Sequence, residues 1–219
     1  MRLDTGGLEG WETSAGAIVG RLDILLEDLP GVRLLDVGSG AGALPIALRR
    51  MKGRFSRGRY VGLDVDPGLV EWCRRRLEDS TYRFAHFDYW NASYNPGGGR
   101  FIALPVEDDW AGAVVLNSVF THMLPDDVAH YVREIGRVMA PDAVALITAF
   151  LYDEQSPDLD RFPHEGDGYR FTKAGSPESE LGLPAAWLLE RFAEAGLKVE
   201  RRPGHQDLLI ARPELGPGR

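Results

Sequence analysis

Short apolar segments alternate with segments of helical periodicity along most of this chain, and this alternation constrains the fold more than any other feature. The strand-like segments lie at 32–40, 59–66, 82–87, 111–120 and 143–152. Strands that are apolar along their whole length are typical of a parallel sheet covered by helices on both faces. Two adjacent strand-like segments, 197–202 and 206–213, follow the last helical segment and indicate an antiparallel hairpin. The sequence therefore predicts an α/β fold with a doubly wound, mostly parallel seven-stranded sheet and an antiparallel terminal strand.

The domain organisation is predicted to be simple. A chain of 219 residues fits one domain, here 1–219, and shows no internal repeat and no linker-like segment between domains. The segment 153–183 is rich in Pro, Gly, Ser, Asp and Glu and has no clear period. Because it is too long for a plain connection, we expect it to form a lid or a substrate-side insertion.

The composition limits the partners of the chain. A net charge of −8 argues against a protein whose main role is to bind the nucleic-acid backbone. Two basic runs, 49–59 and 74–76, indicate solvated helix ends and faces, with a patch for an acidic substrate or RNA as the alternative. No signal-peptide pattern and no apolar run of membrane-spanning length is visible, so the expected location is the cytoplasm, without a membrane partner. The sequence leaves the oligomeric state open.

A glycine-rich turn carries the strongest functional signal. The stretch "DVGSGAG" at 36–42 places Gly38, Gly40 and Gly42 directly after the first strand-like segment. Alternating glycines let the backbone turn sharply and approach a ligand closely, with helix N–H groups directed outward. Asp64 ends the second strand-like segment, where a carboxylate can bind the two hydroxyls of a ribose. Together these features predict a cofactor that contains a nucleoside.

The residues alone leave two nucleotide classes open. A P-loop is excluded because no lysine and hydroxyl residue follow the glycines in "AGALPIA". A dinucleotide fold stays open, since Ala43 stands three residues after Gly40. Tyr169 and Lys173 have the spacing of a short-chain dehydrogenase pair, but that pair must lie on a helix and its surroundings here are loop-like.

The remaining class is identified by resemblance. The stretches "LLDVGSGAG", "YVGLDVDP" and "VVLNSVF" resemble the motifs of class I S-adenosylmethionine-dependent methyltransferases over roughly residues 30–151. A closer resemblance is to a bacterial subgroup with a Trp-Cys pair, an Asp-x-x-Asn-x-x-Tyr-Asn-Pro stretch and a Phe-Thr-His-Met-Leu-Pro stretch. These appear here as "WC" at 72–73, "DYWNASYNP" at 88–96 and "FTHMLP" at 120–125. The loop "RRPGH" between the last two strand-like segments is shorter than is usual in that subgroup. The resemblance implies the Rossmann-like methyltransferase fold with S-adenosyl-L-methionine as the cofactor.

The resemblance also implies a set of cofactor contacts. The methionine part would lie on the glycine turn, the ribose on Asp64, and the adenine amine on Asp88, with Val65 and Tyr89 against the ring. Asn117 and Ser118 would face the amino-acid part. The implied contacts of the glycine turn are Asp36, Gly38, Ser39, Gly40 and Gly42.

The acceptor is constrained less. The segment after the fourth strand reads "NSVF", without the prolines of the Asn/Asp-Pro-Pro-aromatic tetrad of amino methyltransferases that act on bases or glutamine. We therefore expect a small-molecule acceptor, methylated at oxygen or nitrogen, with His122 as the general base. No carboxylate cluster of the kind that assists some methyltransferases with a metal is recognisable, and the single cysteine, Cys73, excludes a cysteine metal cluster. The alternatives are a non-catalytic module that binds S-adenosylmethionine or a partner and, behind it, a nicotinamide-dependent oxidoreductase.

Overall fold

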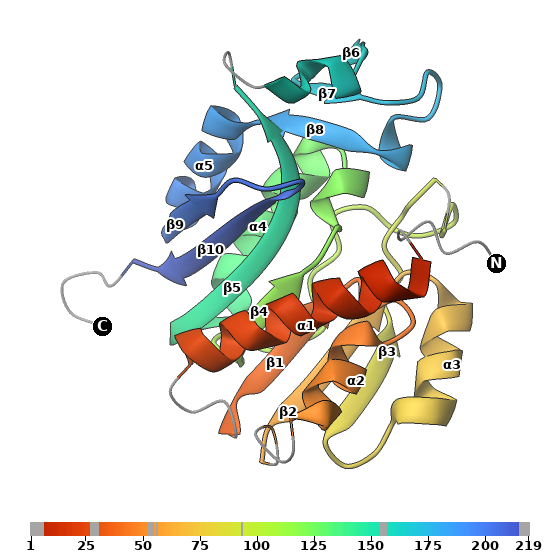
Figure 1. The fold of residues 1–219 in the computed structure, drawn as a ribbon, viewed down its shortest axis with the longest axis vertical. Helices are drawn as coiled ribbons and strands as arrows, with labels where there is room; N and C mark the ends of the chain where they lie inside the picture. The colour runs from red at the N-terminus through yellow and green to blue at the C-terminus, as the bar shows by residue number, and fades with distance from the viewer. Residues whose placement is uncertain are drawn as a thin grey trace.

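A computed structural model describes residues 7–26, 31–51, 55, 57–92, 94–153 and 157–214. They form a twisted sheet with helices on both faces (Figure 1). The central strands have the order β3-β2-β1-β4-β5, and every neighbouring pair among them is parallel. The bounds of these strands are β1 Arg33–Val37, β2 Arg59–Asp64, β3 Tyr82–His86, β4 Ala111–Leu116 and β5 Met139–Tyr152. From β1 the chain adds strands first on one side, β2 and β3, and then on the other side, β4 and β5. A crevice for a ligand is therefore expected beyond the carboxyl ends of β1 and β4, where the strand order changes direction.

The two terminal strands complete the predicted seven. β10 (Asp207–Pro213) pairs antiparallel with both β5 and β9 (Leu197–Arg202), which confirms the antiparallel end of the sheet. Its register joins Asp207 to Ala149 and Ala211 to Ala145. The start of β10 therefore lies beside the carboxyl-terminal half of β5.

Helices cover the sheet in two layers with separate hydrophobic cores. α1 (Gly7–Leu25), α2 (Ala43–Arg50) and α3 (Pro67–Leu77) lie on the face turned to the viewer in Figure 1, and α4 (Pro125–Val138) and α5 (Ala185–Glu194) lie behind it. Alternate residues of each strand face the two layers, as the two-residue period of a strand requires. The front core includes Leu34, Tyr60, Phe84, Val115 and Leu146.

The number of strands departs from the prediction, because the described residues contain ten strands rather than seven. The additional strands β6 (His164–Gly166) and β7 (Tyr169–Phe171) lie in the segment 153–183, and β8 (Leu181–Pro184) begins in it and ends one residue beyond. The short 3-10 helices η3 (Pro157–Arg161) and η4 (Pro177–Ser179) accompany them. Strands of three or four residues are too short to show a period of two, so the sequence pattern could not reveal them.

The length of β5 explains how the additional strands join the sheet. β5 has 14 residues, and its pairing with β10 ends at Ala149. Phe150, Leu151 and Tyr152 extend beyond that point and pair in parallel with β8, which in turn pairs with β7. The segment 153–183, which we refer to as the insertion, is therefore joined to the main sheet by backbone hydrogen bonds.

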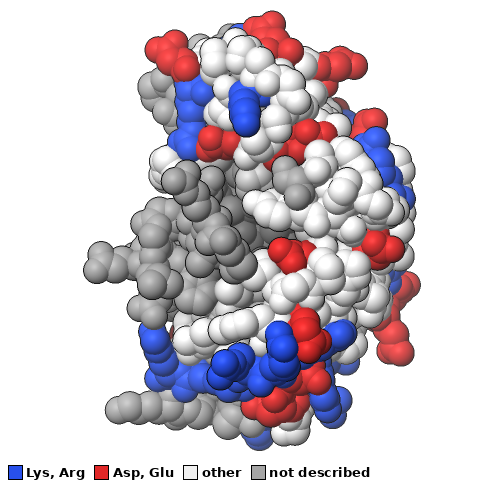
Figure 2. All heavy atoms as spheres, turned by 90° about the vertical axis from the view of Figure 1, so that its right-hand side faces the viewer, with Lys and Arg blue, Asp and Glu red and all other residues white. Residues whose placement is uncertain are grey.

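The charged side chains are distributed unevenly over the surface. Figure 2 shows lysine and arginine gathered at the end of the molecule that carries α3, and acidic residues prominent at the opposite end, near the insertion. The basic run 74–76 is exposed on α3, and nearby arginines have acidic partners: Arg75 with Glu71, Arg83 with Glu78, and Arg49 with Asp79. Among the described residues, no helix combines the length and apolar character needed to cross a membrane.

Candidate functional site

The glycine turn follows β1 at the carboxyl edge of the sheet and leads into α2. Gly38, Gly40 and Gly42 have φ angles of 77°, 53° and 78°, in the left-handed region that favours glycine. A Cβ on Gly38 would lie 2.6 Å from the Val119 side chain, and one on Gly42 would lie 2.3 Å from Leu77. The turn therefore favours glycine at all three positions for its conformation, and at Gly38 and Gly42 also for packing. Ser39 lies between two of these glycines and is buried.

Asp36 lies under this turn on the front face of the sheet. Its side chain is 3 % exposed, and its carboxylate accepts a hydrogen bond from the Tyr60 hydroxyl at 2.5 Å. Burial raises the pKa of Asp36 to about 7, although the Tyr60 hydrogen bond opposes this change; the charge of Asp64 adds to it. Tyr60 is a partner that sequence reasoning missed, because it lies on the neighbouring strand and reads as an ordinary core residue.

Asp64 connects the two turns at the ends of β1 and β2. Its Oδ2 accepts the Gly40 N–H at 2.7 Å, and its Oδ1 accepts the Asp66 N–H at 2.9 Å. Burial raises the pKa of Asp64, and hydrogen bonds from the backbone of Asp66, Gly40 and Val65 counteract the rise. A carboxylate has about four acceptor positions. About one of those on Asp64 can therefore still accept a hydroxyl group of a ligand.

The end of β4 adds a cluster of polar groups on the same face. The Thr148 hydroxyl of β5 accepts the Ser118 N–H at 2.7 Å and donates to Asn117 Oδ1 at 3.3 Å. The Ser118 hydroxyl donates to Gln206 Oε1 at 3.1 Å, which connects β4 to the turn before β10. Ser118 has a φ of 60°. A non-glycine residue in this region costs on the order of 1–3 kcal/mol, and such strain is concentrated at functional sites.

His122 lies in the 3-10 helix η2 (Phe120–His122), which follows this cluster. Its Nδ1 lies 3.0 Å from the backbone oxygen of Glu178, in η4 of the insertion. A carbonyl oxygen can only accept, so this contact places the proton of the neutral imidazole on Nδ1. The lone pair of Nε2 is then available to receive a proton. The contact joins residues 56 positions apart, and no sequence pattern indicates it.

In the loop after β3, the adjacent residues Asp88 and Tyr89 have different environments, since one side chain is exposed and the other is buried. Asp88 is exposed, and its Oδ1 accepts a hydrogen bond from Asn95 Nδ2 at 2.9 Å. Tyr89 is 3 % exposed, and its ring packs edge-on against Tyr131 in the rear core. Its ring is thus turned into the protein, whereas the resemblance implies a contact with the cofactor. Val65 is half-buried and accepts a hydrogen bond from His86 through its backbone oxygen.

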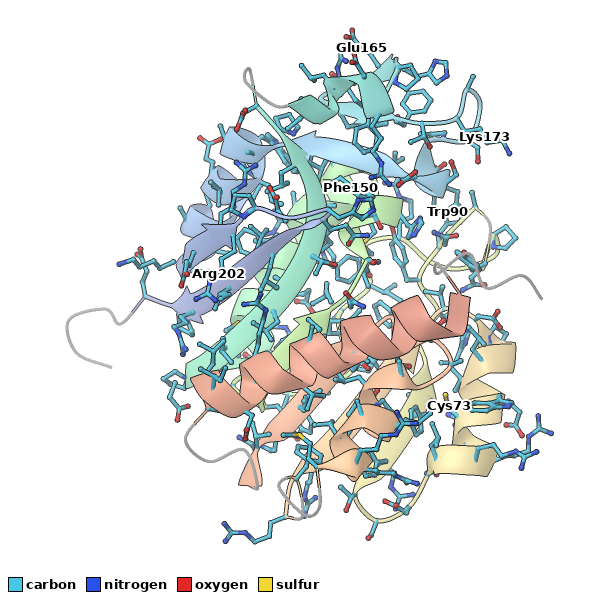
Figure 3. All side chains as sticks on the ribbon, in the orientation of Figure 1. Cys73, Trp90, Phe150, Glu165, Lys173 and Arg202 are labelled. Atoms are coloured by element: carbon cyan, nitrogen blue, oxygen red, sulfur yellow. The ribbon has the colours of Figure 1, made fainter. Side chains whose placement is uncertain are left out.

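Figure 3 labels Trp90, in the loop after β3, and Lys173, in the insertion, both toward the right-hand side of the view. Cys73, on α3, lies lower on the same side. Cys73 is buried against the glycine turn, with its Sγ 3.4 Å from the Gly40 oxygen. Burial raises the pKa of the Cys73 thiol to about 12, so the group is a neutral packing residue at physiological pH. The described residues contain no group of three or more His, Cys, Asp or Glu side chains arranged to hold a metal ion.

Comparisons with known proteins assign the fold and the family. Residues 35–147, just over half of the chain, match the model of the family described as "Methyltransferase domain". A protein-L-isoaspartate O-methyltransferase of Aeropyrum pernix is 36% identical over 74 residues, which are 34% of this chain and 28% of that protein. A ribosomal RNA small subunit methyltransferase C of Stutzerimonas stutzeri is 40% identical over 84 residues, 35% of this chain and 24% of that protein. The chain thus spans about a quarter of the length of these curated relatives.

A solved structure extends the likeness to the whole fold. An S-adenosylmethionine-dependent methyltransferase of Methanosarcina mazei superposes with a TM-score of 0.63 at 13% identity, covering 91% of this chain and 98% of that one. At this identity the match shows the fold alone. The chain belongs to the methyltransferase domain family and has the Rossmann-like fold of its S-adenosylmethionine-dependent members.

Proposed function

We propose that this protein transfers the methyl group of S-adenosyl-L-methionine to a small-molecule acceptor, at oxygen or nitrogen. The observation that carries the proposal is the junction of Asp64 with the glycine turn. Asp64 accepts the Gly40 N–H at 2.7 Å and still has an acceptor position for a ribose hydroxyl. The site thus offers a backbone cradle and a carboxylate to one nucleoside-bearing ligand.

The residues present fit that cofactor along its length. The glycine turn would hold the methionine part through Gly38, Ser39, Gly40 and Gly42, with Asp36 beneath them. Asn117 and Ser118 would contact the amino-acid group, and Val65 would line the adenine. Asp88 would accept from the adenine amine, because Asn95 engages only its Oδ1. For Tyr89 we propose a supporting role through the backbone of the loop, since its ring is buried.

The transfer step requires few chemical groups from the protein. The cofactor supplies a methyl group already activated on a sulfonium, so the chain must mainly orient the acceptor in line with it. A hydroxyl or ammonium acceptor must also lose a proton. The Nε2 lone pair of His122 would take that proton, with the Glu178 carbonyl holding the ring through Nδ1. The segment 153–183, which supplies this carbonyl, would form the lid on the acceptor side.

The acceptor class distinguishes this proposal from its alternatives. The relatives named above act, by their names, on protein and on ribosomal RNA. A small molecule is favoured here by the net charge of −8 and by the acidic partners of the arginines near α3. A nicotinamide oxidoreductase is disfavoured because Tyr169 lies in strand β7 and not on the helix that its pairing with Lys173 requires.

Replacing Asp64 with alanine is expected to weaken binding of S-adenosylhomocysteine by at least about 30-fold, since hydrogen bonds to a charged group contribute about 1.5–3 kcal/mol each. The change would also release the Gly40 and Asp66 amides. Calorimetric titration with S-adenosylmethionine, S-adenosylhomocysteine and NADH measures the effect and compares the two cofactor classes.

Asp142→Ala is the matched control, because Asp142 is exposed near the amino-terminal end of β5, away from the carboxyl edge of the sheet where Asp64 lies. Its affinity for S-adenosylhomocysteine should equal that of the unmodified protein. Binding of NADH alone by the unmodified protein would rule out the proposed cofactor. Unchanged affinity of Asp64→Ala would show that the ribose lies elsewhere.

Replacing His122 with alanine is expected to lower turnover about 100-fold or more, while binding of the cofactor stays the same, because a general base contributes typically 10²–10⁴-fold. The acceptor would first be found by incubating the unmodified protein with methyl-labelled S-adenosylmethionine and small-molecule extracts. Thr121→Ala, the neighbouring residue in η2, provides a control for disturbance of the segment. Near-normal turnover of His122→Ala on a hydroxyl acceptor would exclude the base role.

A further inference from the structure

The loop that follows β3 closes on itself between residues 88 and 99. The Gly99 N–H donates to the Asp88 oxygen, and the Trp90 N–H donates to the Gly99 oxygen, both at 2.8 Å. Inside this outer pair, the backbones of Asn91 and Asn95 exchange two hydrogen bonds of 3.0 and 3.1 Å. We call the segment 88–99 the clasp. Its two ends are held together by the backbone, so the described side chains within it, at 88–92 and 94–99, have defined positions.

The side chain of Asn95 points back to the start of the clasp. Its Nδ2 donates to Asp88 Oδ1 at 2.9 Å and to the Tyr89 oxygen at 3.1 Å. Both hydrogens of the amide are therefore used, which fixes the amide and one oxygen of the Asp88 carboxylate. Among the described contacts, Oδ2 of Asp88 has no protein donor.

Gly98 is what allows this amide to fit. A Cβ at Gly98 would lie 2.6 Å from Asn95 Nδ2, 2.6 Å from the Tyr89 carbonyl carbon and 2.7 Å from the Trp90 nitrogen. Two of these atoms belong to the backbone and cannot move aside cheaply. Gly97 is different, because nothing lies within 4 Å of a Cβ placed there. The two adjacent glycines therefore provide a disruptive position and a harmless one in the same turn.

The clasp is also anchored to the rest of the protein. Arg100 directly follows it and binds Asp127 of α4 through Nε at 3.2 Å and Nη2 at 2.5 Å. The Asp127 side chain is fully buried, and Tyr89, at the other end of the clasp, hydrogen-bonds to the same carboxylate. Asp127 thus holds both ends of the clasp against α4.

We propose that Asn95 is a positioning residue that orients the Asp88 carboxylate for the exocyclic amine of an adenine. With Oδ1 held by Asn95, Oδ2 is directed to accept from the amine of the ligand. This inference rests on the proposed function, because it assumes that Asp88 meets the adenine of S-adenosylmethionine. It gives Asn95 and Gly98 of the clasp a role in selecting an amino purine over an oxo purine.

The test measures the ratio of two affinities by calorimetric titration, with S-adenosylhomocysteine and its deaminated analogue S-inosylhomocysteine as probes. The analogue presents a carbonyl oxygen where adenine presents an amine, so a carboxylate that is held in place should repel it. The unmodified protein is expected to prefer S-adenosylhomocysteine at least about tenfold, the effect of one hydrogen bond to a charged group. Asn95→Asp, Asn95→Ala and Gly98→Ala should reduce that preference to about threefold or less, and Gly97→Ala should retain it.

The outcomes separate the two proposals. A merely structural role for Asn95 would lower both affinities together and leave their ratio unchanged, which would overturn the inference. Equal binding of the two probes by the unmodified protein would overturn both the adenine contact of Asp88 and this inference, while the cofactor class stands. No binding of S-adenosylhomocysteine would overturn the proposed function itself. Asn95→Asp preserves the size of the side chain, so the test holds even if the smaller variant folds poorly.

Discussion

Replacing Arg100 with alanine is expected to lower the free energy of unfolding by about 3 kcal/mol, because breaking an ion pair around a buried charge typically costs about 3–5 kcal/mol. Asp127 is fully buried, and Arg100 is its cationic partner, through two hydrogen bonds. The Arg100 side chain is 40% exposed, so we place the expected loss at the lower end of that range. Urea unfolding followed by circular dichroism measures the change.

Arg76→Ala is the control for this experiment, since Arg76 is an exposed arginine on α3. A substitution at such a surface position is expected to change the free energy of unfolding by less than about 0.5 kcal/mol. A loss below about 1 kcal/mol for Arg100→Ala would match an ordinary exposed ion pair. That result would contradict the role of Asp127 as the anchor of the clasp.

Replacing Asp36 with asparagine is expected to stabilise the ligand-free protein at pH 8, by up to about 4 kcal/mol at about 1.4 kcal/mol per unit of pKa. Burial raises the pKa of Asp36 from 3.8 to about 7. Between these two values the folded state holds a proton that the unfolded state has released, so stability falls as the pH rises through this window. The loss of folding stability caused by Asp36 is complete above pH 7 and absent below pH 4. The amide oxygen of asparagine can still accept the Tyr60 hydrogen bond.

The measurement compares melting temperatures of Asp36→Asn and the unmodified protein at pH 5 and pH 8. The difference between the two proteins should grow with pH, whereas Asp142→Asn, at an exposed position, should follow the unmodified protein at both values. A difference that is the same at pH 5 and pH 8 would show that Asp36 keeps an ordinary pKa in the folded state. A second variant, Tyr60→Phe, removes the hydrogen bond that opposes the rise and should steepen the loss of stability with pH.

Local spacing was enough to predict where the glycine turn and Asp64 lie in the fold. The glycine turn and Asp64 each follow a strand directly, so the position of the strand also fixes the position of the side chain. Gly38, Gly40 and Gly42 have the left-handed conformations that their alternation predicts. The last helix also ends at a glycine, since Gly196 follows α5 with a φ of 71°, as is common at the ends of helices.

Contacts between distant segments could not be predicted from local patterns. Tyr60 reaches Asp36 across neighbouring strands, and Glu178 reaches His122 from the insertion. The orientation of the Tyr89 side chain could not be predicted either, because β3 ends at His86 and the alternation of side chains between the two faces ends with it. Each of these features depends on the register of elements that are brought together only by the fold.

The part of β5 that extends beyond its pairing with β10 has a consequence for how such a protein can diversify. Among the described residues, the insertion pairs with β5 at Phe150, Leu151 and Tyr152, beyond the last pairing of β5 with β10. Its strands can therefore be exchanged or lengthened without changing the register of the strands that carry Asp36 and Asp64. Under the proposed function, a chimaera that receives the segment 153–183 from a relative would retain the residues proposed for the cofactor and acquire a new acceptor side. The binding of the methyl donor and the choice of the acceptor would then depend on separable parts of one sheet.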